Sequence, residues 1–175
     1  MEKTELYSVS FKTLKEGRHN FSFDINDDFL KHYSISNVKG LCIGANIKLH
    51  KSDHFIRAEF NLSGTINIRC GRCLEYFDLP VSHESELTAE FADYNSDLSE
   101  ADKHILIDEG EGKLKLDQHF YDFIVLSIPY KPVHPEVNGE YTCNPEMIEN
   151  LEKHSGTNDD KIDPRWDKLK NVFNK

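Results

Sequence analysis

The sequence lacks any apolar run approaching the ~20 residues that a membrane-spanning helix requires. Its first five residues, Met1 to Glu5, also lack the charged-then-apolar layout of a secretory signal peptide. Four cysteines in 175 residues are too few for a disulfide framework. Together these absences predict a cytoplasmic protein with no membrane partner.

Recognisable catalytic signatures are missing as well. The chain contains no GxSxG, no HExxH and no phosphate-cradling glycine loop. Carboxylate pairs in residues 83–111 could serve acid–base chemistry in principle, but a solvated face or a region that binds a basic partner explains them better. We therefore expect no enzymatic activity and no small-molecule substrate, and an RNA-processing enzyme is the weakest of the functional classes considered.

A strongly basic surface, the usual mark of a nucleic-acid-binding protein, is absent too, since the formal net charge is −10. The acidity is local, however. Residues 83–111 hold ten carboxylates against Lys103 alone, whereas residues 1–82 hold eleven Lys and Arg against ten Asp and Glu. The total charge therefore does not exclude RNA contact elsewhere in the chain, and the acidic block suits a basic partner.

Apolar and polar residues alternate from residue 56 to 70, which is typical of a half-buried antiparallel strand. Gly64 lies on the apolar side of this alternation and predicts a bulge or bend. Further strands are expected at 7–11, 21–25, 41–49, 77–91 and 105–108. Since Cys70 and Cys73 separate two of the long strands, they are expected at the tip of a hairpin.

Helices are predicted by their start signals. Asn26 begins a short one, Asp117 caps one that ends before Pro129, and Asn144-Pro145 begins another. Asp163-Pro164 is a strong start for a last helix.

The fold class is therefore α+β: a mainly antiparallel twisted sheet or partly open β-barrel with a few C-terminal helices. The expected organisation is a single domain over residues 1–154, a polar linker over 155–162 and a C-terminal helical motif over 163–175. That motif docks either on the domain or on a partner.

The CxxC pair is the sharpest local feature. Thiolates of Cys70 and Cys73 on a tight turn can point at one ion, and Gly71 permits the sharp backbone path. The pair could also be two unliganded thiols or the remnant of a metal site. A thioredoxin-like redox role is disfavoured because that motif opens a helix in a βαβ unit.

A structural zinc ion needs four ligands, and the sequence has no second CxxC. The remaining candidates are His134 and Cys143, both in the proline-rich loop 129–143, and Cys42 on an upstream strand. A Cys70/Cys73/His134/Cys143 site would pin that loop to the hairpin tip. Zinc is accordingly the candidate cofactor.

Arg69 and Arg72 flank the cysteines and give the hairpin tip a local positive charge. Arginine on a protruding turn suits phosphate contact, although a solvated tip explains the pair equally well.

Three segments in this order resemble the YceD family, the large ribosomal RNA subunit accumulation proteins. They are the strand leading into Cys70-Gly71-Arg72-Cys73-Leu74, the stretch from Asp117 through Pro132-Val133-His134, and Asp163-Pro164-Arg165-Trp166-Asp167-Lys168-Leu169. Where many relatives carry a further cysteine, this chain has Asn144-Pro145-Glu146. That variant resembles the form found in Bacteroidetes-type bacteria and leaves His134 as the necessary fourth ligand.

The resemblance implies a cytoplasmic, non-enzymatic factor that supports large ribosomal RNA accumulation and large-subunit assembly. Its expected partner is the precursor large subunit, through ribosomal RNA or a ribosomal protein. The alternative is a protein–protein interaction module with a structural zinc knuckle and no RNA contact. Arg165 and Trp166 either pair with phosphate and stack on a partner, or anchor the C-terminal helix within the chain.

Overall fold

The computed structural model describes residues 7–91, 104–107, 112–137 and 140–155. Contacts divide the chain into two units, residues 1–134 and residues 135–175, and each is described by itself. The predicted linker at 155–162 lies almost entirely outside the described residues, and the helical motif at 163–175 lies wholly outside them. The predicted domain boundaries therefore stay a prediction.

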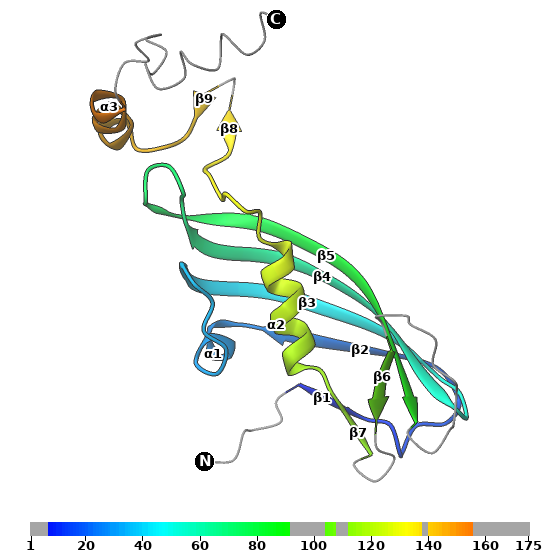
Figure 1. Cartoon of the computed structure of the whole chain (residues 1–175). Helices are drawn as coiled ribbons and strands as arrows, with labels where there is room; N and C mark the ends of the chain where they lie inside the picture. Colours follow the sequence, from blue (N-terminus) through cyan, green and yellow to red (C-terminus); the bar gives the residue numbers. More distant parts are fainter. Residues whose placement is uncertain (1–6, 92–103, 108–111, 138–139, 156–175) are drawn as a thin grey trace, which may run out of the picture. The chain divides into compact units, whose positions relative to one another are not determined.

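The first unit is built on a five-stranded sheet whose strands lie in the order β2-β3-β4-β5-β6 (Figure 1). The strands are β2 Gly17–Ile25, β3 Val38–Lys51, β4 Phe55–Arg69, β5 Tyr76–Phe91 and β6 His104–Ile107. Each of the first four pairs antiparallel with the next strand in sequence, with helix α1 (Asp27–Leu30) between β2 and β3, and β6 pairs parallel with the end of β5. The predicted strands are thus confirmed, and β3, β4 and β5 are unusually long.

Two small sheets complete the strands. In the first unit, β1 (Ser8–Ser10) pairs antiparallel with β7 (Lys113–Lys115), which joins residues about a hundred positions apart in sequence. In the second unit, β8 (Glu136–Val137) and β9 (Glu140–Tyr141) form a short antiparallel hairpin inside the loop predicted at 129–143.

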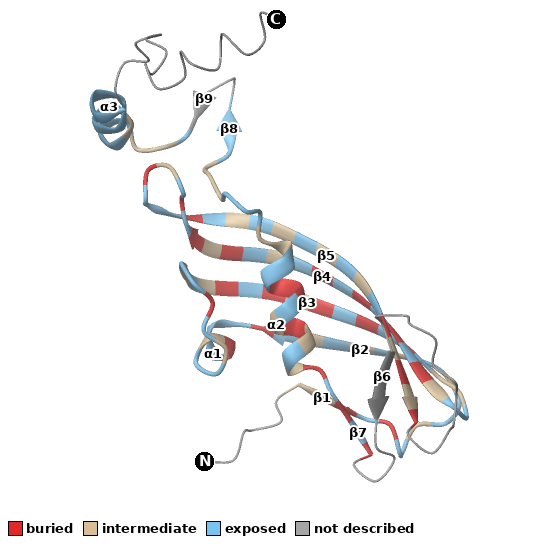
Figure 2. Ribbon diagram, viewed as in Figure 1, coloured by how far each residue is buried: buried red, intermediate tan, exposed pale blue. Residues whose placement is uncertain are grey.

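Burial follows the alternation of the sequence, as the banding of β3 and β4 in Figure 2 shows. One face of the sheet, here called the inner face, is covered by helix α2 (Asp117–Ser127). Aromatic rings fill the space between them: Phe120 packs edge-on against Phe60 and Phe23, and Phe123 packs against Phe60. Burying such side chains contributes roughly 1.5–3 kcal/mol each, so α2 is held mainly by this cluster.

Two of the helices begin as their sequences predict. The Asn26 side chain accepts a hydrogen bond from the Asp28 amide at the start of α1 (Asp27–Leu30). In the second unit, Asn144 accepts from the amides of Glu146 and Met147 at the start of α3 (Pro145–His154). An acceptor side chain at this position satisfies amides that the helix leaves unpaired.

The predicted cap of α2 is wrong. The N-cap position is Leu116, whose side chain makes no capping bond, and Asp117 is the first residue of the helix. The Asp117 carboxylate instead accepts a hydrogen bond from the hydroxyl of Tyr33, which follows α1. The carboxylate that the local sequence predicted as a helix cap is therefore bonded to a residue far away in sequence.

The bulge predicted at Gly64 is also absent, because the register runs unbroken from Ile43 through Gly64 to Val81. Glycine is required there for another reason. A Cβ atom at position 64 would lie 2.1 Å from the carbonyl oxygen of Cys42 and 2.7 Å from the Cα of Ile43. The neighbouring strand approaches too closely for any side chain.

These elements confirm the α+β class, with a mainly antiparallel, twisted sheet. Among the described residues, no helix has the length and apolarity to cross a membrane.

Candidate metal centre

The turn between β4 and β5 carries Cys70 and Cys73, so the CxxC lies at the tip of a long hairpin as predicted. Both thiol side chains are buried. The turn is closed by two backbone bonds, from the Cys70 amide to the Glu75 carbonyl at 2.7 Å and from the Leu74 amide to the Cys70 carbonyl at 3.1 Å. Leu74 takes a left-handed conformation with φ of 66°, which is uncommon for a non-glycine residue.

The loop after α2 is tied to this turn. The Gly71 amide donates to the Pro132 carbonyl at 2.7 Å. Two residues further on, the Nδ1 atom of His134 lies 3.4 Å from the Sγ atom of Cys73. The imidazole stacks on Phe77 of β5, with ring centroids 4.5 Å apart and planes inclined by 29°. Phe77 thereby fixes the ring so that Nδ1 faces the thiols.

Cys143 belongs to the second unit, and its position follows from bonds within its own hairpin. The Pro135 carbonyl accepts hydrogen bonds from both the amide and the hydroxyl of Thr142, each at 3.2 Å. The chain therefore returns to Pro135, the residue directly after His134, before it reaches Cys143. Local hydrogen bonding thus brings the last cysteine close to the histidine.

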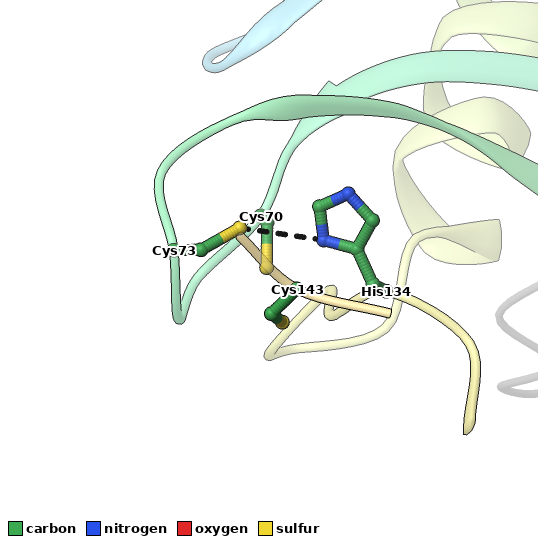
Figure 3. A group of neighbouring side chains, drawn as sticks. All are labelled: Cys70, Cys73, His134 and Cys143. Atoms are coloured by element: carbon green, nitrogen blue, oxygen red, sulfur yellow. Dashed lines mark hydrogen bonds between the residues drawn. The ribbon is translucent and has the colours of Figure 1, made fainter. Parts of the chain in front are cut away.

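The four predicted ligands come together. One ligand atom from each of Cys70, Cys73, His134 and Cys143 lies within 4.8 Å of the other three (Figure 3). In a tetrahedral zinc site with Zn–S of about 2.3 Å and Zn–N of about 2.0 Å, neighbouring ligand atoms are about 3.5–3.8 Å apart. The Cys73–His134 separation of 3.4 Å lies close to the lower end of this range, and the donor set is one that zinc favours in structural sites.

Cys42, the remaining ligand candidate, is exposed on β3 and is not part of the group. It lies opposite Thr65 on the side of the sheet away from the inner face.

Electrostatics at the turn favour a thiolate. Burial raises the pKa of the Cys70 thiol, but hydrogen bonds from the backbone amides of Cys73, Arg72 and His134 and from the His134 side chain outweigh it and bring the pKa to about 6. One of these bonds runs from the Arg72 amide to the Cys70 sulfur at 3.4 Å. Amides aimed at a sulfur stabilise its negative charge, and a deprotonated thiol is the form that binds metal.

The predicted partner-binding residues fall in two places. Arg69 is exposed at the end of β4, and its Nε atom donates to the Leu74 carbonyl at 3.0 Å. Arg72 is half-buried in the turn itself. Arg165 and Trp166 lie outside the described residues.

The sequence did not single out two contributors to the centre. Phe77 supports the histidine ring and Pro132 anchors the turn. Phe77 had a signal, since it stands at an inward position of the alternation and only seven residues after Cys70, whereas no local pattern marks the carbonyl of Pro132.

Comparison with protein families matches residues 58–173 to the model described as large ribosomal RNA subunit accumulation protein YceD. The matched span includes all four residues of the thiol–imidazole group, most of β4, all of β5 and α2. No curated protein and no solved structure matches the chain.

Proposed function

Because the chain belongs to the YceD family, whose description links it to accumulation of the large ribosomal RNA subunit, we propose that it is a non-enzymatic binding factor for large-subunit assembly. It binds precursor particles through ribosomal RNA or a ribosomal protein. The protein acts in the cytoplasm, where ribosome precursors are assembled in bacteria.

The observation that carries this proposal is the group of three thiols and one imidazole at the β4–β5 turn. Four sulfur and nitrogen donors are enough to fill the coordination sphere of a tetrahedral zinc ion and would leave no position for a substrate, as in structural rather than catalytic zinc sites. A zinc ion held by Cys70, Cys73, His134 and Cys143 would cross-link the chain segments that carry them. Such a cross-link is consistent with a protein that presents a binding surface, and it is not an argument for catalysis.

Residues around the turn supply a binding surface. Leu74 and Tyr76 are both about half exposed, at 48% and 47%, although large apolar side chains are usually covered. Lys39 lies over the Tyr76 ring at 5.6 Å, and Arg69 is exposed on the adjoining strand. Aromatic and cationic groups side by side suit ribosomal RNA, where rings stack on bases and cations pair with phosphates.

Co-sedimentation tests the proposal. Full-length tagged chain is expected to migrate with precursors of the large subunit and not with the small subunit. A double variant, Arg69→Glu with Tyr76→Ala, should reduce that association severalfold, while Cys42→Ser, placed away from the turn, should leave it unchanged. Migration of the wild-type chain only at the top of the gradient would contradict the proposal.

A second candidate is a protein–protein interaction module without RNA contact. The acidic segment at 83–111 favours it, because ribosomal proteins are basic. Treating lysates with ribonuclease before sedimentation separates the two candidates. If the chain still binds ribosomal protein after the RNA is digested, the protein–protein module is supported. If the association disappears, RNA contact is supported.

A further inference from the structure

The sheet has a second face, opposite α2, on which the exposed residues of β2, β3 and β4 point outward; it is called the outer face below. At the end of the sheet away from the cysteine turn, the register places Arg18 directly opposite His50, and His50 directly opposite Arg57. Three cationic or protonatable side chains thus stand in one cross-strand row.

In this row Arg18 and Arg57 flank His50, and directly opposed residues on one face have Cβ atoms about 4.5–5.5 Å apart. Arg57 is paired with Glu86, whose carboxylate lies 3.0 Å from its Nε. Within the described part of the chain, neither Arg18 nor the adjacent Lys48 has an ion pair or a side-chain hydrogen bond. Lys48 does stand directly opposite Glu59 in the register, so an anionic ligand would supply the countercharge that Arg18 lacks and a direct partner for Lys48.

The same residues surround a hollow of about 440 Å³. Its lining includes Arg18, Asn20, Lys48, His50 and Arg57, contributed by three adjacent strands. A surface depression with cations on its walls concentrates field lines and attracts anions.

Two neighbouring rings border the hollow. The rings of His50 and Phe55 are tilted relative to each other, with centroids 6.5 Å apart and planes inclined by 40°. Phe55 is half-buried and lines the hollow beside Arg57. Cations that pair with phosphate next to rings that stack on bases are the combination by which proteins hold single-stranded nucleic acid.

Two carboxylates limit the cationic area. Glu59 also lines the hollow, and Glu86 on β5 forms an ion pair with Arg57. The cationic strip therefore runs across β2 and β3, through Arg18 and Lys48.

We propose that this end of the outer face binds a single-stranded segment of RNA, its phosphates against Arg18 and Lys48 and a base against His50 and Phe55. The choice of RNA rests on the proposed role in ribosomal RNA accumulation. The site is separate from the cysteine turn, because it lies at the opposite ends of β3 and β4.

Fluorescence anisotropy of the full chain with a labelled, mixed-sequence RNA of about 12 nucleotides tests the site. Arg18→Gln combined with Lys48→Gln should weaken binding roughly tenfold and lower the slope of log affinity against log salt by about 1.4, or about 0.7 per phosphate contact. Phe55→Leu should weaken binding with the salt slope unchanged, because it removes stacking alone.

A variant that binds RNA more tightly is a useful second test, because misfolding would weaken binding and not strengthen it. Glu59→Gln removes a carboxylate from the lining and should tighten RNA binding by roughly threefold. The matched control for the Arg18/Lys48 variant is Lys31→Gln with Lys153→Gln, which removes the same two charges at exposed positions outside the hollow and should leave affinity within about twofold.

Failure would take one of three forms: no binding of this RNA by the wild-type chain, unchanged affinity in the Arg18/Lys48 variant, or equal binding of polyglutamate of the same charge, which would indicate an acidic protein partner. Any of these overturns the outer-face site while co-sedimentation with large-subunit precursors still stands. Loss of co-sedimentation alone would instead contradict the proposed function.

Discussion

The imidazole of His134 faces the sulfur of Cys73 at 3.4 Å, although 61 residues separate them in sequence. Phe77 holds the ring from one side, and the Gly71–Pro132 bond holds the backbone. Packing and hydrogen bonding, without any metal–ligand bond, are therefore enough to position the histidine. Such preorganisation lowers the entropic cost of metal binding.

Zinc content follows from this arrangement. Purified wild-type protein should contain about one equivalent of zinc by elemental analysis, since the donor set is complete. Cys73→Ser and His134→Ala should each lose most of it. Cys42→Ser is the matched control, because Cys42 is exposed and outside the group, and it should retain the wild-type content. Wild-type protein free of metal after expression in zinc-supplemented medium would refute the site.

The thiol of Cys70 should make the metal-free protein sensitive to pH. Its pKa is lowered from 9.0 to about 6 in the folded chain, whereas the unfolded thiol keeps its ordinary value. A lowered pKa stabilises the fold above the unfolded pKa, and this contribution is lost as pH falls from about 9 to about 6. Urea unfolding of chelator-treated protein over that range should show stability rising with pH, and Cys70→Ala should flatten the rise. Equal slopes in the two proteins would count against a thiolate at this turn.

A second pH effect is expected from His119, which lies on α2. Burial lowers the pKa of His119, with Asp122 and Asp117 opposing the shift, and its ring stacks on Phe123, which also stacks on His83. A lowered histidine pKa favours the neutral ring in the fold, so stability should decline as pH falls below about 6.5. His119→Gln should weaken this decline in thermal melts, whereas His32→Gln, at an exposed position, should not. A decline that is identical in all three proteins would assign it to other groups.

Gly64→Ala should be among the most destabilising single-methyl additions in the sheet. The new Cβ would lie 2.1 Å from a backbone oxygen that cannot turn aside, so the cost should exceed about 2 kcal/mol in chemical denaturation. Gly44→Ala provides the control, since the nearest atom there is 3.8 Å away, and its effect should stay within about 1 kcal/mol. Similar values for both would mean that β3 and β4 separate easily at this point.

Sequence patterns predicted the parts of this fold that depend on local periodicity. Alternation located β4 and β5 and therefore put Cys70 and Cys73 at a hairpin tip. The ligand set was predictable because few cysteines exist to choose from and His134 stands near Cys143. Features that depend on register were not predictable: the opposition of Arg18, His50 and Arg57 exists only once β2, β3 and β4 are aligned.

Long-range contacts account for the other differences. Nothing near Asp117 shows that its carboxylate will accept a hydrogen bond from Tyr33, and the three-residue strand β7 is too short to give a periodic signal. Gly64 was predicted to mark a bulge or bend, but the structure shows that glycine is needed there because the neighbouring strand lies close. A glycine within a strand is compatible with either feature, and the sequence alone does not distinguish them.

The closure of the chain at Pro135 and Thr142 has a practical consequence. Both ends of the β8–β9 hairpin are fixed at its base, beside His134 and Cys143, so the peptide between them can change in length without moving either ligand. An epitope or a fluorophore-bearing sequence inserted between Val137 and Glu140 would therefore leave the donor group intact. The hairpin thus offers an attachment point for following the protein on assembling particles.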